Sequence, residues 1–126
     1  MGMGTGIQSY RDLIVWQEAM SLAEACYMIT RRFPRDELFG LTSQIRRAAA
    51  SVPANVAEGY GREVKGSYIQ SLRIAQGSLK ELETHLLLAE RVELLQSDTT
   101  VELIAAAERV GKMLRALIRA LQAGSK

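Results

Sequence analysis

The stretch that decides the fold is Gly40–Gly61, with the sequence GLTSQIRRAAASVPANVAEGYG. Its apolar residues recur at steps of three and four: Leu41, Ile45, Ala48, Val52 and Val56. Residues at these steps share one face of an α-helix. An apolar face of this kind packs against a neighbouring helix. The stretch therefore predicts an amphipathic helix inside a helical bundle.

A second, polar line runs beside the apolar one with the same steps: Gln44, Arg47, Ser51, Asn55, Glu58 and Arg62. Polar lines on helices usually face water. Here five flanking residues, Ala48, Ala49, Ala50, Ala54 and Ala57, are small, so another backbone can approach closely. Two interpretations stay open, a solvated face and a structural line that is mostly internal. We favour the structural line, in which Glu58 pairs with Arg47 or Arg62 and Asn55 makes hydrogen bonds.

Pro53 lies within this periodic stretch. A proline in a helix lacks the N–H that would bond the carbonyl four residues earlier, and its ring crowds that carbonyl. The sequence therefore predicts a kink or a break near Val52, with Ser51 or Asn55 available to satisfy a freed backbone group.

Three further stretches have helical periodicity: 12–32, 64–92 and 100–121. Asp12 is the expected N-cap of the helix over 12–32. Pro34 or Asp36 is expected to open the helix that contains Gly40–Gly61. Thr99 and Glu102 have the spacing of a capping box at the start of the helix over 100–121. Gly77 interrupts the third, which suggests a close helix contact there.

The predicted fold class is all-α, an antiparallel up-down four-helix bundle with a proline-kinked second helix. The expected organisation is a flexible N-terminal segment (1–9), one bundle domain (10–122) and a flexible tail (123–126).

The first helix carries two apolar seams. One consists of Leu13, Trp16, Met20, Ala23, Tyr27 and Thr30, and the other of Val15, Ala19, Leu22, Cys26, Ile29 and Phe33. One antiparallel partner needs only one stripe. The second seam therefore predicts a further neighbour, either inside the bundle or in another subunit, and we expect an obligate homo-oligomer.

The chain also resembles a known family. The residues that carry the resemblance are the core LTSQIRRAAASVPANVAEGYGR, the preceding YRDLIVWQEAMSLAEACYMITRRFP and the following IAQGSLKELETHLLLA. They are similar to the bacterial 23S rRNA intervening-sequence proteins and, more distantly, to the accessory variability determinants of diversity-generating retroelements. The similarity extends from Tyr10 to about Leu121. It implies a four-helix bundle that assembles into a ring-like homo-oligomer, a pentamer, but no settled biochemical activity.

Residues for catalysis or metal binding are scarce. The chain has one cysteine, Cys26, and one histidine, His85. A ferritin-like di-metal site needs a Glu-x-x-His motif on two helices, and a nucleophile needs a base and an orienting group. The segment GYGREVKG lacks the Walker pattern. We predict a non-enzyme with no catalytic residue, metal or cofactor.

The sequence also bears on the compartment. A single cysteine permits no intrachain disulfide, as is usual in the reducing cytoplasm, and there is no secretory signal or apolar run of membrane-spanning length. We expect a cytoplasmic protein that makes no contact with membranes.

Charge leaves two classes of function open. The formal net charge is only +2, so nucleic-acid binding would depend on local basic residues. The candidates are Arg46, Arg47, Arg62 and Lys65, repeated around a ring, with Tyr60 and Tyr68 as the aromatic residues considered for base stacking. The first class is an oligomeric accessory protein that associates with RNA or DNA. The second is a scaffolding bundle that binds a partner protein.

Overall fold

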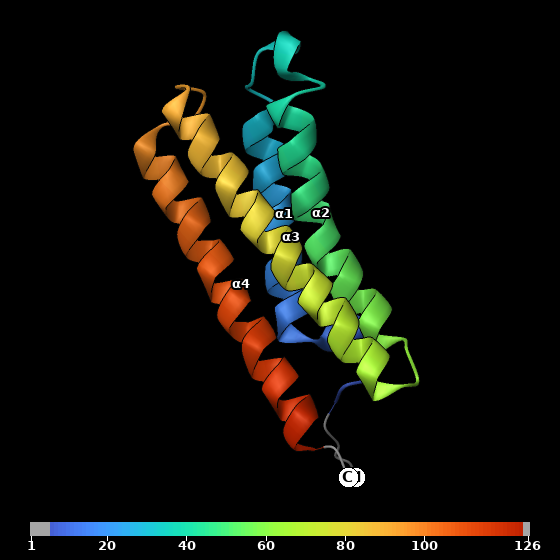
Figure 1. The fold of residues 1–126 in the computed structure, drawn as a ribbon. Helices are drawn as coiled ribbons and strands as arrows, with labels where there is room; N and C mark the ends of the chain where they lie inside the picture. Colours follow the sequence, from blue (N-terminus) through green and yellow to red (C-terminus); the bar gives the residue numbers. More distant parts are fainter. Residues whose placement is uncertain (1–5, 125–126) are drawn as a thin grey trace.

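The computed structural model describes residues 6–124, and four long helices account for most of them (Figure 1). They are α1 (Ile14–Thr30), α2 (Leu41–Tyr60), α3 (Lys65–Arg91) and α4 (Ser97–Ala123), with short 3-10 helices η1 (Tyr10–Asp12) and η2 (Arg35–Glu37). The described residues contain no strand. The predicted all-α four-helix bundle is confirmed.

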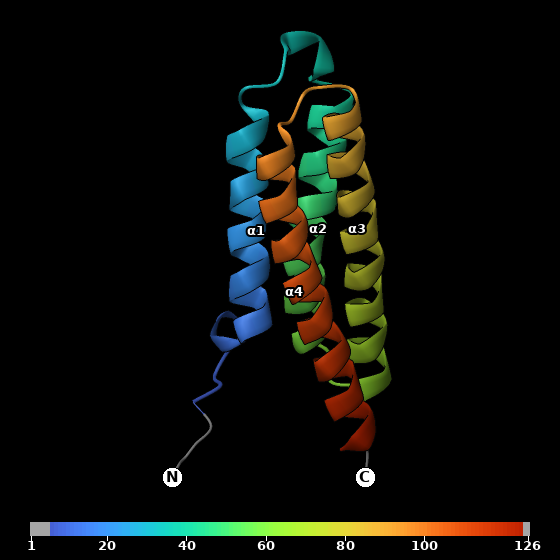
Figure 2. The same ribbon diagram turned by 90° about the vertical axis from the view of Figure 1, so that its left-hand side faces the viewer.

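Successive helices run antiparallel, and each packs against two others (Figures 1 and 2). The contacting pairs are α1 with α2, α2 with α3, α3 with α4, and α4 with α1. Within the described residues the backbones of the diagonal pairs, α1 with α3 and α2 with α4, do not approach closely, and side chains of all four helices meet in one central core. The α1–α2 and α3–α4 connections lie at the same end of the bundle (Figure 2).

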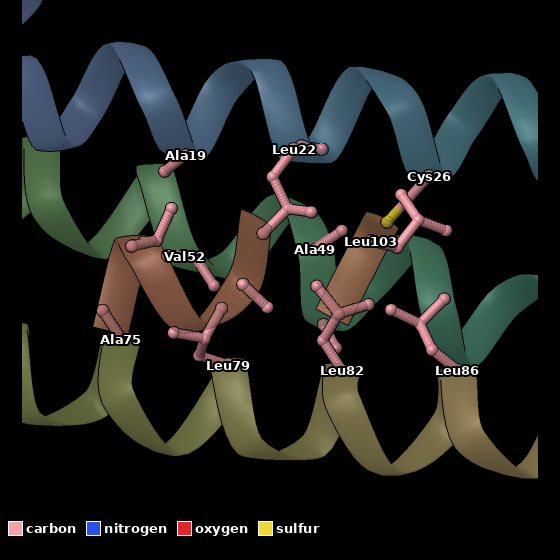
Figure 3. Packing of buried hydrophobic residues seen from close by; sticks show 14 of the residues in the cluster. Ala19, Leu22, Cys26, Ala49, Val52, Ala75, Leu79, Leu82, Leu86 and Leu103 are labelled. Atoms are coloured by element: carbon pink, nitrogen blue, oxygen red, sulfur yellow. The ribbon is translucent and has the colours of Figure 1, made fainter. Parts of the chain in front are cut away.

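The core is built from leucines that fill space next to small residues (Figure 3). Leu72, Leu79, Leu82 and Leu86 of α3 are buried, and so are Ala19, Ala49, Ala75 and Ala107. Large side chains opposite alanines let the helices interdigitate at the packing density of protein interiors. The regular steps of α3 in the sequence are therefore the steps of its buried face.

Pro53 does not interrupt α2, which continues from Leu41 to Tyr60 (Figure 1). Asn55 Nδ2 donates hydrogen bonds to the Ser51 carbonyl at 2.8 Å and to Ser51 Oγ at 3.0 Å. The Asn55 amide therefore reinforces the turn around Pro53, although it does not bond the Ala49 carbonyl, which lacks its usual donor because of the proline.

The helix starts differ from the sequence-based predictions. Asp12 does not cap α1; its carboxylate accepts from the backbone N–H of Gln8 at 2.8 Å and of Ser9 at 3.1 Å. The N-caps of α1 and α4 are Leu13 and Gln96, and neither makes a side-chain cap bond. The capping box at Thr99 is wrong, because α4 begins at Ser97.

The start of α2 is also later than expected, because Pro34 and Asp36 precede η2 or lie in it. The helix begins at Leu41, whose N–H donates to Glu37 Oε1 at 3.0 Å. Glu37 thus supplies the cap that the sequence analysis sought in Asp36.

The domain boundaries shift slightly at both ends. Ser9 caps η1 by accepting from the Arg11 N–H, and α4 extends through Ala123 into the predicted tail. Residues 1–5 and 125–126, on which the rest of the terminal predictions fall, lie outside the described residues. Among the helices of residues 6–124, none combines the length and the apolar character needed to cross a membrane.

Candidate nucleic-acid interface

The four predicted phosphate-contacting residues fall into two pairs at opposite ends of α2. Arg46 and Arg47 lie in its first half, whereas Arg62 and Lys65 lie at the α2–α3 connection. At 1.5 Å of rise per residue, Arg47 and Arg62 are about 22 Å apart along the helix axis. One chain therefore does not bring the four residues together in one patch.

Arg46 is held by the chain itself. Its Nε donates to Thr30 Oγ1 at 2.8 Å, its Nη2 donates to the Tyr27 carbonyl at 3.4 Å, and its guanidinium lies 4.8 Å from the centroid of the Tyr27 ring. Thr30 is buried and its hydroxyl in turn bonds the Cys26 carbonyl at 2.8 Å. Arg46 therefore joins α2 to the last turns of α1, a structural role that the sequence analysis did not foresee.

Arg47 has no hydrogen bond or ion pair within the described residues and is exposed. It borders an open hollow of about 580 Å³ that extends across the outer face of α2. Gln44, Ser51, Ser78 and Glu81 line the same hollow. Its floor is shallow because small residues, Ala50 among them, occupy the outer face of α2, so Arg47 is available to a ligand.

At the other end of α2, Arg62 is paired and Lys65 is not. Arg62 Nη2 donates to Glu58 Oε2 at 2.7 Å, with about half of each side chain exposed. An exposed pair one helical turn apart contributes little stability, on the order of 0.3–0.5 kcal/mol. Arg62 can therefore exchange Glu58 for a phosphate with little loss of folding free energy. Lys65 is half-buried and has no partner within the part of the chain described.

The polar line of α2 is divided by the structure. Ser51 Oγ lies 2.8 Å from Ser78 Oγ of α3, and Asn55 bonds Ser51, so the centre of the line joins two helices. The two ends differ: Gln44, Arg47, Glu58 and Arg62 are exposed in the single chain. The expectation that the line is mostly internal is therefore wrong for the chain alone, because no helix of the same chain covers the outer face of α2.

An apolar groove of about 570 Å³ lies beside the hollow, between α1 and α2. Trp16, Met20 and Tyr27 line one side of it, and Pro53 and Ala54 line the other. Met20 and Tyr27 are each more than two-fifths exposed. The first seam of α1 therefore divides: Ala23 and Thr30 are buried, while Met20 and Tyr27 border an open groove.

The structure also shows basic residues that the sequence analysis overlooked, on α4. Lys112, Arg115 and Arg119 are exposed and make no ion pair within residues 6–124. Their steps of three and four place them on one face, a signal that was present in the sequence. Lys112 and Arg115 line a groove of about 350 Å³ between α3 and α4 together with Lys80, Glu83 and Glu108.

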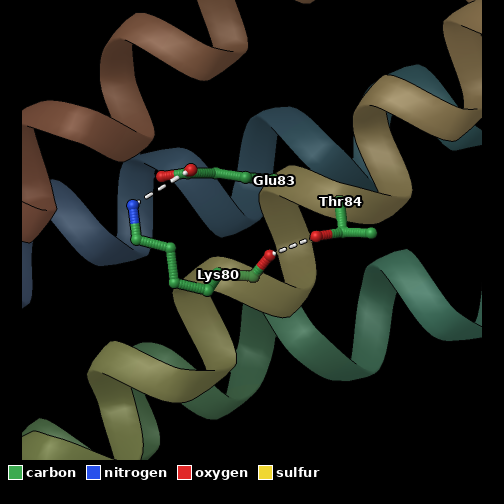
Figure 4. A network of polar contacts seen from close by, with 3 residues as sticks. All are labelled: Lys80, Glu83 and Thr84. Atoms are coloured by element: carbon green, nitrogen blue, oxygen red, sulfur yellow. Dashed lines mark hydrogen bonds and ion pairs between the residues drawn. The ribbon is translucent and has the colours of Figure 1, made fainter.

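Acidic residues offset part of the positive charge in the groove between α3 and α4. Lys80 Nζ lies 3.3 Å from Glu83 Oε1, and Thr84 Oγ1 donates to the Lys80 carbonyl at 2.9 Å (Figure 4). Glu83 Oε2 is buried without a hydrogen-bond partner among the described residues. Because Glu83 and Glu108 share the groove with three cations, its excess positive charge is small.

Tyr60 and Tyr68, the aromatic residues considered for base stacking, pack against each other. Their rings meet edge to face with centroids 6.3 Å apart. Burial raises the pKa of the Tyr68 phenol, and the neighbouring Tyr60 adds to this rise. Their mutual packing fixes the end of α2 against α3, so neither ring is free to stack on a base.

The potentially reactive groups do not assemble into a site. Burial raises the pKa of the Cys26 thiol to about 12, which keeps it protonated near neutral pH. His85 has a buried Nδ1 without a hydrogen-bond partner in the described part of the chain. Among residues 6–124, no three His, Cys, Asp or Glu side chains lie close enough together to hold a metal ion.

Comparisons with known proteins agree with this architecture. Residues 11–116 match the family model described as 23S rRNA-intervening sequence protein. No curated protein matches the chain. Among solved structures, the chain is similar to a protein of unknown function from the S23 ribosomal protein family of Bacteroides thetaiotaomicron, with a TM-score of 0.76, 22% identity, and coverage of 83% of this chain and 98% of that one. That likeness shows the four-helix fold, and the family match covers most of the chain. The protein therefore belongs to the 23S rRNA-intervening sequence protein family.

Proposed function

We propose that this protein is a homo-oligomeric, non-enzymatic accessory protein that associates with RNA in the cytoplasm. The observation that carries the proposal is the number of exposed cations left without an intrachain ion pair within residues 6–124. They are Arg11, Arg31, Arg32, Arg35, Arg47, Arg73, Arg91, Lys112, Arg115 and Arg119. The family description, which names a ribosomal RNA intervening sequence, favours RNA over DNA as the polyanion.

Assembly supplies the valency that one chain lacks. A formal net charge of +2 is too small for a single subunit to hold a polyanion tightly. The apolar α1–α2 groove is a suitable assembly surface, because Met20 and Tyr27 would be buried there. A closed ring such as a pentamer repeats Arg47 and Lys65 once per subunit. Several weak phosphate contacts then act together, provided that their spacing fits the strand.

Phosphate binding by this surface has a definite salt dependence. Each neutralised phosphate releases condensed counterions, so log affinity falls linearly with log salt concentration. The expected slope is about −0.7 per phosphate for single strands and about −0.9 for duplex DNA. The measurement is fluorescence anisotropy of the native oligomer with labelled structured RNA, single-stranded RNA and duplex DNA across a salt series.

Substitution of Arg47 and Lys65 tests whether these two cations contact phosphate. Replacing Arg47 and Lys65 with Ala removes two cations per subunit that have no partner among residues 6–124, so we expect weaker binding and a shallower slope. A matched control removes Arg109, which pairs with Glu18 of α1 at 3.5 Å. Absence of RNA binding by the parent at low salt would exclude the proposal. An unchanged slope in the Arg47 and Lys65 variant would place binding on other cations, such as those of α4.

The second candidate function is a scaffold that binds a partner protein, and the α1–α2 groove favours it. An apolar hollow lined by Trp16, Met20 and Pro53 suits an amphipathic helix of another protein. The two functions are distinguished by salt: burial of apolar surface is insensitive to salt over the range that abolishes phosphate contacts.

A further inference from the structure

The connection between α1 and α2 projects beyond the rest of the bundle (Figures 1 and 2). It contains η2 and, two residues before α2 begins, Phe39, which is 93% exposed. Leu38 beside it is 47% exposed. A phenylalanine ring stabilises a fold when it is removed from water, and this ring gains almost none of that stabilisation in the folded chain.

The tip is a fixed structure and not a loose loop. The N–H groups of Glu37, Leu38 and Gly40 donate to the carbonyls of Pro34, Arg35 and Glu37 at 3.0, 3.1 and 2.9 Å. The Glu37 carboxylate also caps α2. A Cβ at Gly40 would lie 2.7 Å from Glu37 Oε1, so the glycine leaves room for that cap.

Phe33 anchors the other side of the connection. Phe33 is the other phenylalanine of the chain, and it is buried in the core. A buried Phe33 and a capped α2 together hold Phe39 away from the bundle. The ring is therefore presented in advance, and binding to it requires little ordering of the backbone.

The charge at the tip indicates the kind of ligand. Arg31, Arg32 and Arg35 are exposed, and none has an ion pair within the described residues. The acidic residues of the same segment are Asp36 and Glu37, and the Glu37 carboxylate is already used by the cap. An exposed aromatic ring in the same short segment as three unpaired guanidinium groups is a combination that suits single-stranded nucleic acids, since bases stack on aromatic rings and phosphates contact arginines.

We propose that the Phe39 tip, defined as residues 31–40, binds unpaired RNA by stacking a base on the Phe39 ring, with Arg31, Arg32 and Arg35 contacting the adjoining phosphates. The inference rests on the proposed RNA association and specifies its substrate as single-stranded. The stacking interaction has no access to a base inside a duplex, so the tip discriminates between single-stranded and paired RNA.

The test measures anisotropy of the parent oligomer and of Phe39→Ala with a labelled single-stranded RNA and with the same RNA in a duplex. Because stacking of one base on an aromatic ring contributes strongly to affinity, we expect Phe39→Ala to bind the single strand about 5- to 150-fold more weakly. The salt slope stays unchanged, because no cation is removed, and duplex affinity stays unchanged as well. Phe39→Tyr restores the affinity, since it keeps an aromatic face.

The controls separate stacking from other roles of an exposed apolar side chain. Val101 of α4 is 66% exposed, so Val101→Ala removes apolar surface elsewhere without loss of binding. In the double variant Arg31→Ala/Arg35→Ala, we expect a shallower slope of log affinity against log salt concentration, while the preference for single-stranded over duplex RNA persists. Because the substituted side chains are exposed, all variants should fold, which circular dichroism verifies.

Three results would overturn the inference and leave the proposed RNA association intact. The first is equal single-strand affinity of the parent and Phe39→Ala. The second is a lower oligomer mass for Phe39→Ala in light scattering, which would make the tip a subunit contact. The third is that Phe39→Ala loses binding to phosphatidylserine vesicles while its RNA binding is unchanged, which would make the tip a membrane contact. If the parent binds no RNA at low salt, the proposed function itself fails.

Discussion

At the residue scale, Arg46 and Arg47 show how adjacent and chemically identical side chains acquire different roles. The helix turns about 100° per residue, so one guanidinium points toward α1 and the other toward the outer hollow. Arg46 satisfies the Thr30 hydroxyl and lies over the Tyr27 ring, whereas Arg47 contacts no partner within the described chain.

This difference predicts opposite effects of two matched substitutions. Arg46→Ala removes a charge-assisted hydrogen bond and a cation–π contact, so we expect the free energy of unfolding to fall by about 1.5–3 kcal/mol. Arg47→Ala should change it by no more than about 0.5 kcal/mol. Urea denaturation followed by circular dichroism measures both. Equal stability of the two variants would show that the Arg46 contacts to α1 contribute nothing.

At the element scale, the spacing between α2 and α3 depends on one glycine. A Cβ at Gly59 would lie 2.8 Å from Tyr68 Cδ1 and 2.9 Å from Ser71 Cβ, so only glycine permits this approach. Gly77 was expected to mark a close helix contact, and that expectation is wrong. No atom would lie within 4 Å of a Cβ at Gly77, because this position of α3 faces outward.

The two glycines therefore predict changes of opposite sign. Gly59→Ala forces the ends of α2 and α3 apart, which we expect to cost about 1–3 kcal/mol. Gly77→Ala gains up to about 1 kcal/mol, since alanine is the better helix former and meets no obstacle. Thermal melts of both variants against the parent provide the measurement. A Gly59→Ala variant as stable as the parent would mean that α2 and α3 can separate there without loss.

At the scale of the whole molecule, the outer face of α2 remains uncovered by its own chain. Four helices around one core leave each with an outward face, and on α2 that face includes Ala50 and Ala54, which also line the apolar groove. These small side chains of α2, beside the exposed Met20 and Tyr27 of α1, leave space for a helix of another molecule. This arrangement is the physical basis for expecting assembly.

Assembly through the groove predicts a defined effect of one charge. Met20→Asp places a carboxylate where a second molecule would bury it without a partner, so we expect the oligomer to dissociate while the chain keeps its helicity. Light scattering gives the mass, and circular dichroism gives the helix content. Val101→Asp, at an exposed residue of α4 that does not line the groove, serves as the positional control and should leave the oligomer mass unchanged. A monomeric parent at micromolar concentration would contradict the assembly.

The sequence by itself determined the fold class, because the period of apolar residues along a helix is local and needs no knowledge of the partner. Leu72, Leu79, Leu82 and Leu86 recur at helical steps within the predicted helix over 64–92, and all four are buried. The family was also evident from the sequence, and the family match confirms it.

Only the tertiary structure decided which polar and basic residues remain free. Arg46, Tyr60 and Tyr68 were candidates for RNA contact, and each is engaged by a residue distant in the sequence or on another helix. Phe39 was not among the candidate binding residues, yet it is the most exposed aromatic side chain described. The physical reason is that exposure and pairing depend on what the other helices bring nearby, and residue spacing within one helix does not contain that information.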